Sequence, residues 1–82
     1  MEMLNGLGVV LMESGDSDQA MQRFEMCRRL APDYDRPYLN MAVLYVNAGH
    51  PEKAHDLLSQ FLARQPDNAE IRQALQEVDS KK

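Results

Sequence analysis

The sequence predicts an all-α fold, an α-solenoid built from five helices that pack as antiparallel pairs. Two observations carry this prediction: apolar residues recur at helical spacing along the chain, and residues 1–34 share a sparse pattern with residues 35–68. Self-similarity at a fixed period is the sequence signature of a repeat architecture. When the two segments are aligned, the identical positions are Val9/Val43, Gly15/Gly49, Ala20/Ala54, Pro32/Pro66 and Asp33/Asp67.

The first unit, residues 1–34, is predicted to be two helices joined by a tight turn. Gly15 can adopt the left-handed conformation that ends a helix, and Asp16 or Ser17 can cap the next one. The second helix stops before Pro32, because the residue before a proline is pushed out of helical geometry. The inward faces predicted from helical spacing carry Leu4, Leu7, Gly8 and Leu11 in the first helix and Ala20, Phe24 and Cys27 in the second.

The second unit, residues 35–68, repeats this plan. Gly49 takes the place of Gly15, and Pro51 suits a first helical position because its missing N–H has no helical partner there. Pro66 then ends the helix as Pro32 does. The inward residues are Tyr38, Met41, Ala42 and Tyr45 in one helix and Ala54, Leu58 and Phe61 in the other.

The remaining segment, residues 69–82, is predicted to be a closing helix with a short tail, all three units forming one domain. Asn68 is a good N-cap for this helix. Ile71, Leu75 and Val78 form one narrow apolar stripe, while the other side is polar. A helix with one apolar face and one polar face covers the core and needs no further neighbour.

Composition limits the partners that the chain can have. Its 82 residues include 44% hydrophobic and 27% charged residues, which is typical of a globular domain. The net charge of −4 argues against binding nucleic acid or an anionic membrane surface. No apolar run is long enough to span a membrane. The single cysteine and the lack of an export signal make a cytoplasmic location the default expectation.

The repeated residues resemble the tetratricopeptide repeat, a 34-residue helix-turn-helix pattern with Leu-Gly, Tyr, Ala, Phe and Pro at set offsets. The resemblance covers residues 1–68, and residues 69–80 are similar to the helix that commonly closes such arrays. It implies a right-handed superhelical array. Two departures are mild: Leu4 stands where Trp is usual, and bulky Phe61 stands where Ala is typical, which implies looser or altered packing there.

The resemblance also implies a protein–protein interaction scaffold whose concave groove holds a peptide or a partner helix. The residues alone support part of this, because Leu39, Val43 and Val46 form a second apolar stripe at i, i+4 and i+7. Such a stripe on a monomer usually has a use, although it could instead pack on the rest of a longer protein. The groove residues that the resemblance implies are Asn5, Val9, Met12, Tyr34, Leu39, Val43, Val46 and Asn47.

A second surface is predicted at the first helix. Met3 and Val10 lie beside its inward positions, where an earlier repeat would pack, and no polar helix precedes them. Two expectations follow. Either the chain is a fragment of a longer protein with more repeats upstream, or two copies associate through this end, which makes a homo-oligomerisation module the alternative function.

The sequence predicts no enzyme activity, no cofactor and no bound metal. His50 and His55 are five residues apart, whereas helical ligand pairs use i, i+3 or i+4 spacing. Cys27 falls at an inward helical position without a histidine within helical reach, so we expect a buried structural thiol. No nucleophile, base and oxyanion donor can be assembled from the pattern.

Overall fold

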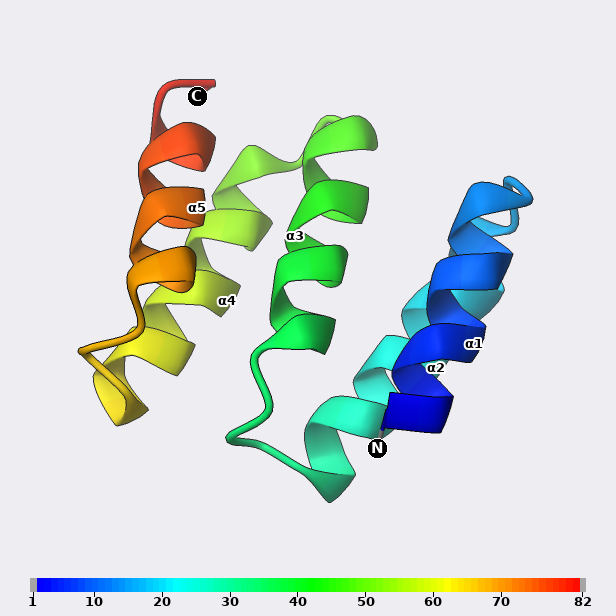
Figure 1. Ribbon diagram of the computed structural model, residues 1–82. Helices are drawn as coiled ribbons and strands as arrows, with labels where there is room; N and C mark the ends of the chain where they lie inside the picture. Colours follow the sequence, from blue (N-terminus) through cyan, green and yellow to red (C-terminus); the bar gives the residue numbers. More distant parts are fainter. Residues whose placement is uncertain (1, 82) are drawn as a thin grey trace.

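The computed structural model describes the backbone of residues 2–81 and the side chains of residues 6–81. Within that range the chain forms five helices and no strand, which confirms the all-α prediction. The first two helices form one hairpin, the next two form a second, and the last packs on the second hairpin, so that α1 and α5 lie at opposite ends of the array (Figure 1). The helices are α1 Glu2–Glu13, α2 Ser17–Leu30, α3 Arg36–Asn47, α4 Pro51–Arg64 and α5 Ala69–Asp79.

The two hairpin turns have the same backbone geometry. Gly15 and Gly49 have φ of +86° and +84°, as predicted for residues that end a helix in the left-handed region. The N–H of Gly15 donates to the Met12 carbonyl at 3.1 Å, and the N–H of Asp16 donates to the Leu11 carbonyl at 2.9 Å. The second turn repeats both bonds one period later, so the shared glycine produces the same Schellman motif twice.

The helices begin with different residues, which deal in different ways with the unpaired N–H groups of the first turn. The Asp16 carboxylate accepts the N–H of Gln19 at 3.2 Å, which confirms the predicted cap of α2. The position that matches Asp16 is His50, which makes no side-chain cap bond, and α4 then begins with Pro51, which has no N–H to satisfy. Asn68 caps α5, as predicted, by accepting the Ile71 N–H at 3.0 Å. Its amide nitrogen also donates to Asp35 at 3.0 Å, which ties the loop before α5 to the loop before α3.

The core is continuous through both hairpins and reaches α5. Ala20 and Ala54 are completely buried, as expected for small residues at close helix contacts. Gly8 shows the same constraint, because an added Cβ would lie within 3.0 Å of three ring atoms of Phe24. Close packing of α1 on α2 therefore requires glycine at this position.

Tyr38 and Phe61 join the two helices of the second hairpin. Their ring centroids are 4.8 Å apart in an edge-to-face arrangement, and both residues are buried. The Tyr38 hydroxyl donates to the Pro32 carbonyl at 2.9 Å, and burial raises the pKa of this phenol. Phe61 is therefore accommodated at the usual alanine offset by a specific aromatic contact, so packing is altered there rather than loosened.

The prediction that Leu7 lies in the core is wrong, because its side chain is 44% exposed. The equivalent residue in the second hairpin, Met41, is completely buried because α3 packs against α2. No described helix packs on the corresponding side of α1. The side chain of Leu4, predicted for the same core face, lies outside the described residues.

Candidate binding groove

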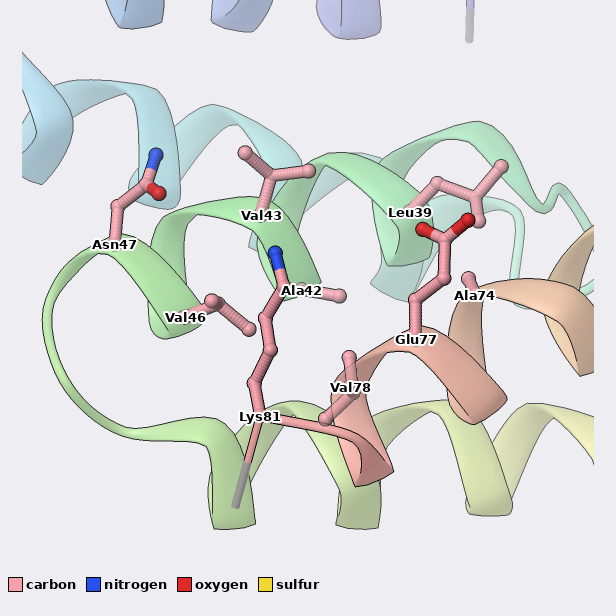
Figure 2. Close-up of a pocket in the computed structure, with 9 residues that line it drawn as sticks. All are labelled: Leu39, Ala42, Val43, Val46, Asn47, Ala74, Glu77, Val78 and Lys81. Atoms are coloured by element: carbon pink, nitrogen blue, oxygen red, sulfur yellow. The ribbon is translucent and has the colours of Figure 1, made fainter.

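The second apolar stripe of α3, formed by Leu39, Val43 and Val46, lines an open cavity of about 250 Å³ between α3 and α5. Val43 is 48% exposed, and Leu39 and Val46 are half-buried. Figure 2 shows Val46 pointing toward α5 and Val43 pointing away from the core. The stripe is therefore not sealed inside this chain.

The cavity exists because α3 has two apolar faces and α5 is lined with small residues where the two helices approach. One face of α3, which includes Tyr38 and Met41, is buried in the core. Ala42 and Val78 are buried at the base of the cavity, and half-buried Ala74 lies on the α5 side. Short side chains at the base leave the space between the helices open.

The rim of the groove is polar and partly charged. Asn47 contributes an amide from the last residue of α3, while Glu77 and Lys81 contribute from α5 and the residues just after it. In Figure 2 the Lys81 side chain extends from the end of α5 toward α3. An apolar base with a few polar groups at the rim is the usual composition of a ligand-binding site.

Polar side-chain contacts join α5 to α3 at its N-terminal end and to α4 at its C-terminal end. At the N-terminal end, Arg36 Nη2 lies 2.7 Å from Glu70 Oε2, and the hydrogen bond to Glu70 raises the pKa of Arg36. At the other end, His55 Nδ1 of α4 lies 2.6 Å from Asp79 Oδ1. Exposed pairs of this kind contribute little stability, so the position of α5 depends mainly on its packing against α4 and α3.

Four of the eight groove residues predicted from the sequence lie at this cavity, namely Leu39, Val43, Val46 and Asn47. Val9 and Met12 are half-buried and pack against the core instead of lining the cavity. Tyr34 is half-buried in the α2–α3 loop. The side chains of Asn5, and of Met3 from the second predicted surface, lie outside the described residues.

The sequence predicted that the closing helix contributes to the groove through Glu70 and Gln73, whereas the residues of this region that line the cavity are Ala74, Glu77, Val78 and Lys81. A signal for two of them was present, because one further 34-residue step from Val43 reaches Glu77, and the same step from Asn47 reaches Lys81. The last segment of the chain therefore lines the groove at the same repeat positions as the first helix of a repeat. At these positions α3 has a valine and an asparagine, whereas the last segment has a glutamate and a lysine.

No group of three or more His, Cys, Asp or Glu side chains able to hold a metal ion occurs among the described residues. Cys27 is buried, and burial raises the pKa of its thiol. The described helices include none that is long and apolar enough to cross a membrane.

Stacked helical hairpins with a groove along one side define the class of helical-repeat proteins. A family model described as tetratricopeptide repeat matches residues 11–78, and the chain belongs to this family. Family membership indicates a protein–protein interaction scaffold, and such repeats are typically non-catalytic. Comparison with curated proteins and with solved structures gave no significant match.

Proposed function

We propose that the chain binds a peptide or a partner helix through the groove between α3 and α5. The observation that carries this proposal is the half-exposed Val43, which lies between Leu39 and Val46 on an otherwise well-packed helix. Exposing this apolar side chain costs free energy that a bound partner recovers.

The cavity volume and the rim limit the chemistry of the partner. A space of about 250 Å³ admits one or two apolar side chains. Asn47 can donate to a backbone carbonyl and accept from a backbone N–H of the bound segment. Glu77 and Lys81 favour a segment that carries a basic and an acidic residue beside its apolar anchors.

Energetics predict modest affinity. Half-burying three aliphatic side chains contributes roughly 2–4 kcal/mol, whereas association costs an estimated 4–15 kcal/mol. Rim hydrogen bonds must supply the difference. We therefore expect dissociation constants that are micromolar or weaker for this chain.

Substitution of Val43 by glutamate tests the groove. Panning a library of random dodecapeptides against the chain should enrich sequences with apolar residues at i, i+3 or i+4 spacing. The selected peptides, titrated by fluorescence anisotropy, should bind Val43→Glu about tenfold or more weakly. Val10→Glu provides the matched control, since it introduces the same charge at an exposed valine on another helix. Selected peptides that bind Val43→Glu as well as the unmodified chain would exclude the groove.

A second candidate function is self-association through the first hairpin. It is supported by Val10, the predicted contact residue, whose side chain is 59% exposed on α1. Light scattering over a range of protein concentrations distinguishes the two candidates, because peptide binding by a monomer gives a constant mass and self-association does not.

A further inference from the structure

A second concave surface lies between α2 and α4, and three arginines line it. We call this surface the arginine crevice. Its residues border an open space of about 210 Å³ and are Arg28, Arg29, Pro32, Tyr38, Gln60 and Arg64. None of them lines the groove between α3 and α5. The crevice is therefore a separate surface, and its charged walls distinguish it from the apolar groove.

The crevice exists because of the way the helices pack. Among the described residues, α2 and α4 both pack on α3 and not on each other. The space between them consequently has one side of α3 as its floor, and Tyr38 lies there. The hydroxyl of Tyr38 is already bound to the Pro32 carbonyl, so the floor offers an aromatic ring between two charged walls.

All charged residues that line the crevice, within the part of the chain that the structure describes, are basic. The chain as a whole has a net charge of −4, so this end of the molecule differs from the average surface. The helix dipole favours basic residues in the last turns of α2 and α4. It does not require that they border one space, where like charges repel each other and an anion is attracted.

The arginines of the crevice are only partly neutralised by neighbouring carboxylates. Arg28 Nη2 lies 2.9 Å from Glu25 Oε2. Arg64 Nε lies 3.7 Å from Asp33 Oδ1, and both of these side chains are exposed. The Arg29 guanidinium has no hydrogen-bond or ion-pair partner among the described residues. Exposed pairs contribute little free energy, so Arg29 and Arg64 can accept an acidic ligand at small cost.

Positive charge from both walls reaches the floor of the crevice. Burial, the largest influence, raises the pKa of Tyr38, while Arg28 of α2 and Arg64 of α4 lower it. The carboxylates of Asp33 and Glu25 act on this pKa less strongly than the arginines. The guanidinium carbon of Arg28 lies 6.0 Å from the centre of the Tyr38 ring. An anion in the crevice is therefore attracted from two sides.

The crevice continues along α4 toward the first turn of this helix. Arg28 and Gln60 also line a neighbouring space of about 220 Å³, which Lys53 and Asp56 border as well. Lys53 and Arg64 belong to the same helix, and their separation is roughly 16 Å at 1.5 Å per residue. An extended segment of about five residues covers this length. A small anion would occupy only one end of it.

We propose that the arginine crevice binds an extended acidic segment of a protein partner, with carboxylates against Arg28, Arg29 and Arg64. A guanidinium group presents parallel N–H donors that match the two oxygens of a carboxylate. Gln60 can both donate to and accept from the backbone of the segment. This site is additional to the groove, because the two surfaces share no lining residue.

Fluorescence anisotropy of a labelled pentaglutamate peptide, titrated with the full chain, tests the proposal. We expect saturable binding at low ionic strength. Its dissociation constant should rise about fivefold or more between about 20 mM and about 200 mM salt, because salt screens exposed charges. A pentaglutamine peptide with the same label should not bind, since it has no carboxylate side chains.

Charge reversal at two arginines locates the site. In Arg29→Glu and in Arg64→Glu the dissociation constant of pentaglutamate should rise about fivefold or more, because attraction is replaced by repulsion. Arg72→Glu is the matched control, since it makes the same change at an exposed arginine of α5 that does not line the crevice. All three side chains are exposed, so circular dichroism should show unchanged helicity.

Four results would overturn the crevice as the site. One is the absence of binding at low salt, and another is equal weakening in all three arginine variants, which would reflect net charge alone. The third is binding that Val43→Glu abolishes and Arg64→Glu leaves intact, which would place the peptide in the groove. The fourth is inorganic phosphate binding as tightly as pentaglutamate, which would indicate a site for a small anion. Peptides selected for the groove should bind Arg64→Glu and the unmodified chain equally, so the two sites are tested separately.

Discussion

The two hairpins follow the same sequence plan but differ in what surrounds them. The second hairpin has α2 on one side and α5 on the other, and the inward residues of both its helices are almost all buried. The first hairpin packs on the second through one side only, so Leu7 and Val10 remain exposed at positions where Met41 and Leu44 are covered. In a repeat protein the burial of a residue thus depends on the neighbouring unit as much as on its own helix.

The hairpins also differ in the purpose that their exposed apolar residues can serve. On the second hairpin the exposed valine lies in a groove between two helices of the same chain. On the first hairpin Leu7 and Val10 lie on a side of α1 that no described helix covers. We propose that the groove accepts a narrow segment, whereas the exposed side of α1 is the surface of the second candidate function.

The largest effect is expected from truncating the centre of the second hairpin. Phe61→Ala removes a buried ring that contacts Tyr38 and should lower the free energy of unfolding by about 3–5 kcal/mol. Leu7→Ala, at an exposed position of the first hairpin, should cost less than about 1 kcal/mol. Urea denaturation monitored by circular dichroism measures both. Equal losses would mean that the two hairpins are equally packed.

A smaller effect is expected within α1, where two glycines differ in their surroundings. Gly8→Ala should destabilise the chain by about 1–3 kcal/mol, because the new methyl group overlaps the Phe24 ring. Gly6→Ala should instead stabilise it by about 0.5–1 kcal/mol, since no atom lies within 4 Å of its added Cβ and alanine favours the helix. Thermal unfolding of the two variants checks the opposite signs. A stabilising Gly8→Ala would contradict the close contact of α1 with α2.

The smallest effect concerns the junction between the hairpins. Tyr38→Phe removes the hydrogen bond to the Pro32 carbonyl and should cost about 0.5–1.5 kcal/mol at neutral pH.

The same variant should change the dependence of stability on alkaline pH. Burial raises the pKa of Tyr38 above its ordinary value of 10.0, so the folded state keeps this proton after the unfolded state has lost it. The resulting stabilisation is complete below pH 10 and is lost as the pH rises through the pKa of the folded state. Urea titrations between neutral pH and pH values above 10 should show a shallower alkaline decline for Tyr38→Phe. An identical decline would mean that Tyr38 ionises freely in the folded chain.

The helices, their ends and the family were predictable from the sequence because they depend on local chemistry. Gly15 and Gly49 end helices since left-handed backbone favours glycine, and Asp16 and Asn68 cap helices through bonds to residues three positions away. Each of these features involves only residues that are a few positions apart in the sequence. A 34-residue period then specifies that similar units are stacked.

Tertiary structure decided which of the predicted faces is covered and what forms each wall of the groove. Leu7 fits a core pattern in the sequence, yet it is exposed, because a helical stripe is buried only where another helix packs on it. Glu77 and Lys81 appear in the sequence as parts of a polar helix, and the packing of α5 near α3 makes them the rim of a cavity. Periodicity fixes which side chains share a face of one helix, whereas the identity of the neighbour opposite that face depends on contacts between residues far apart in the chain.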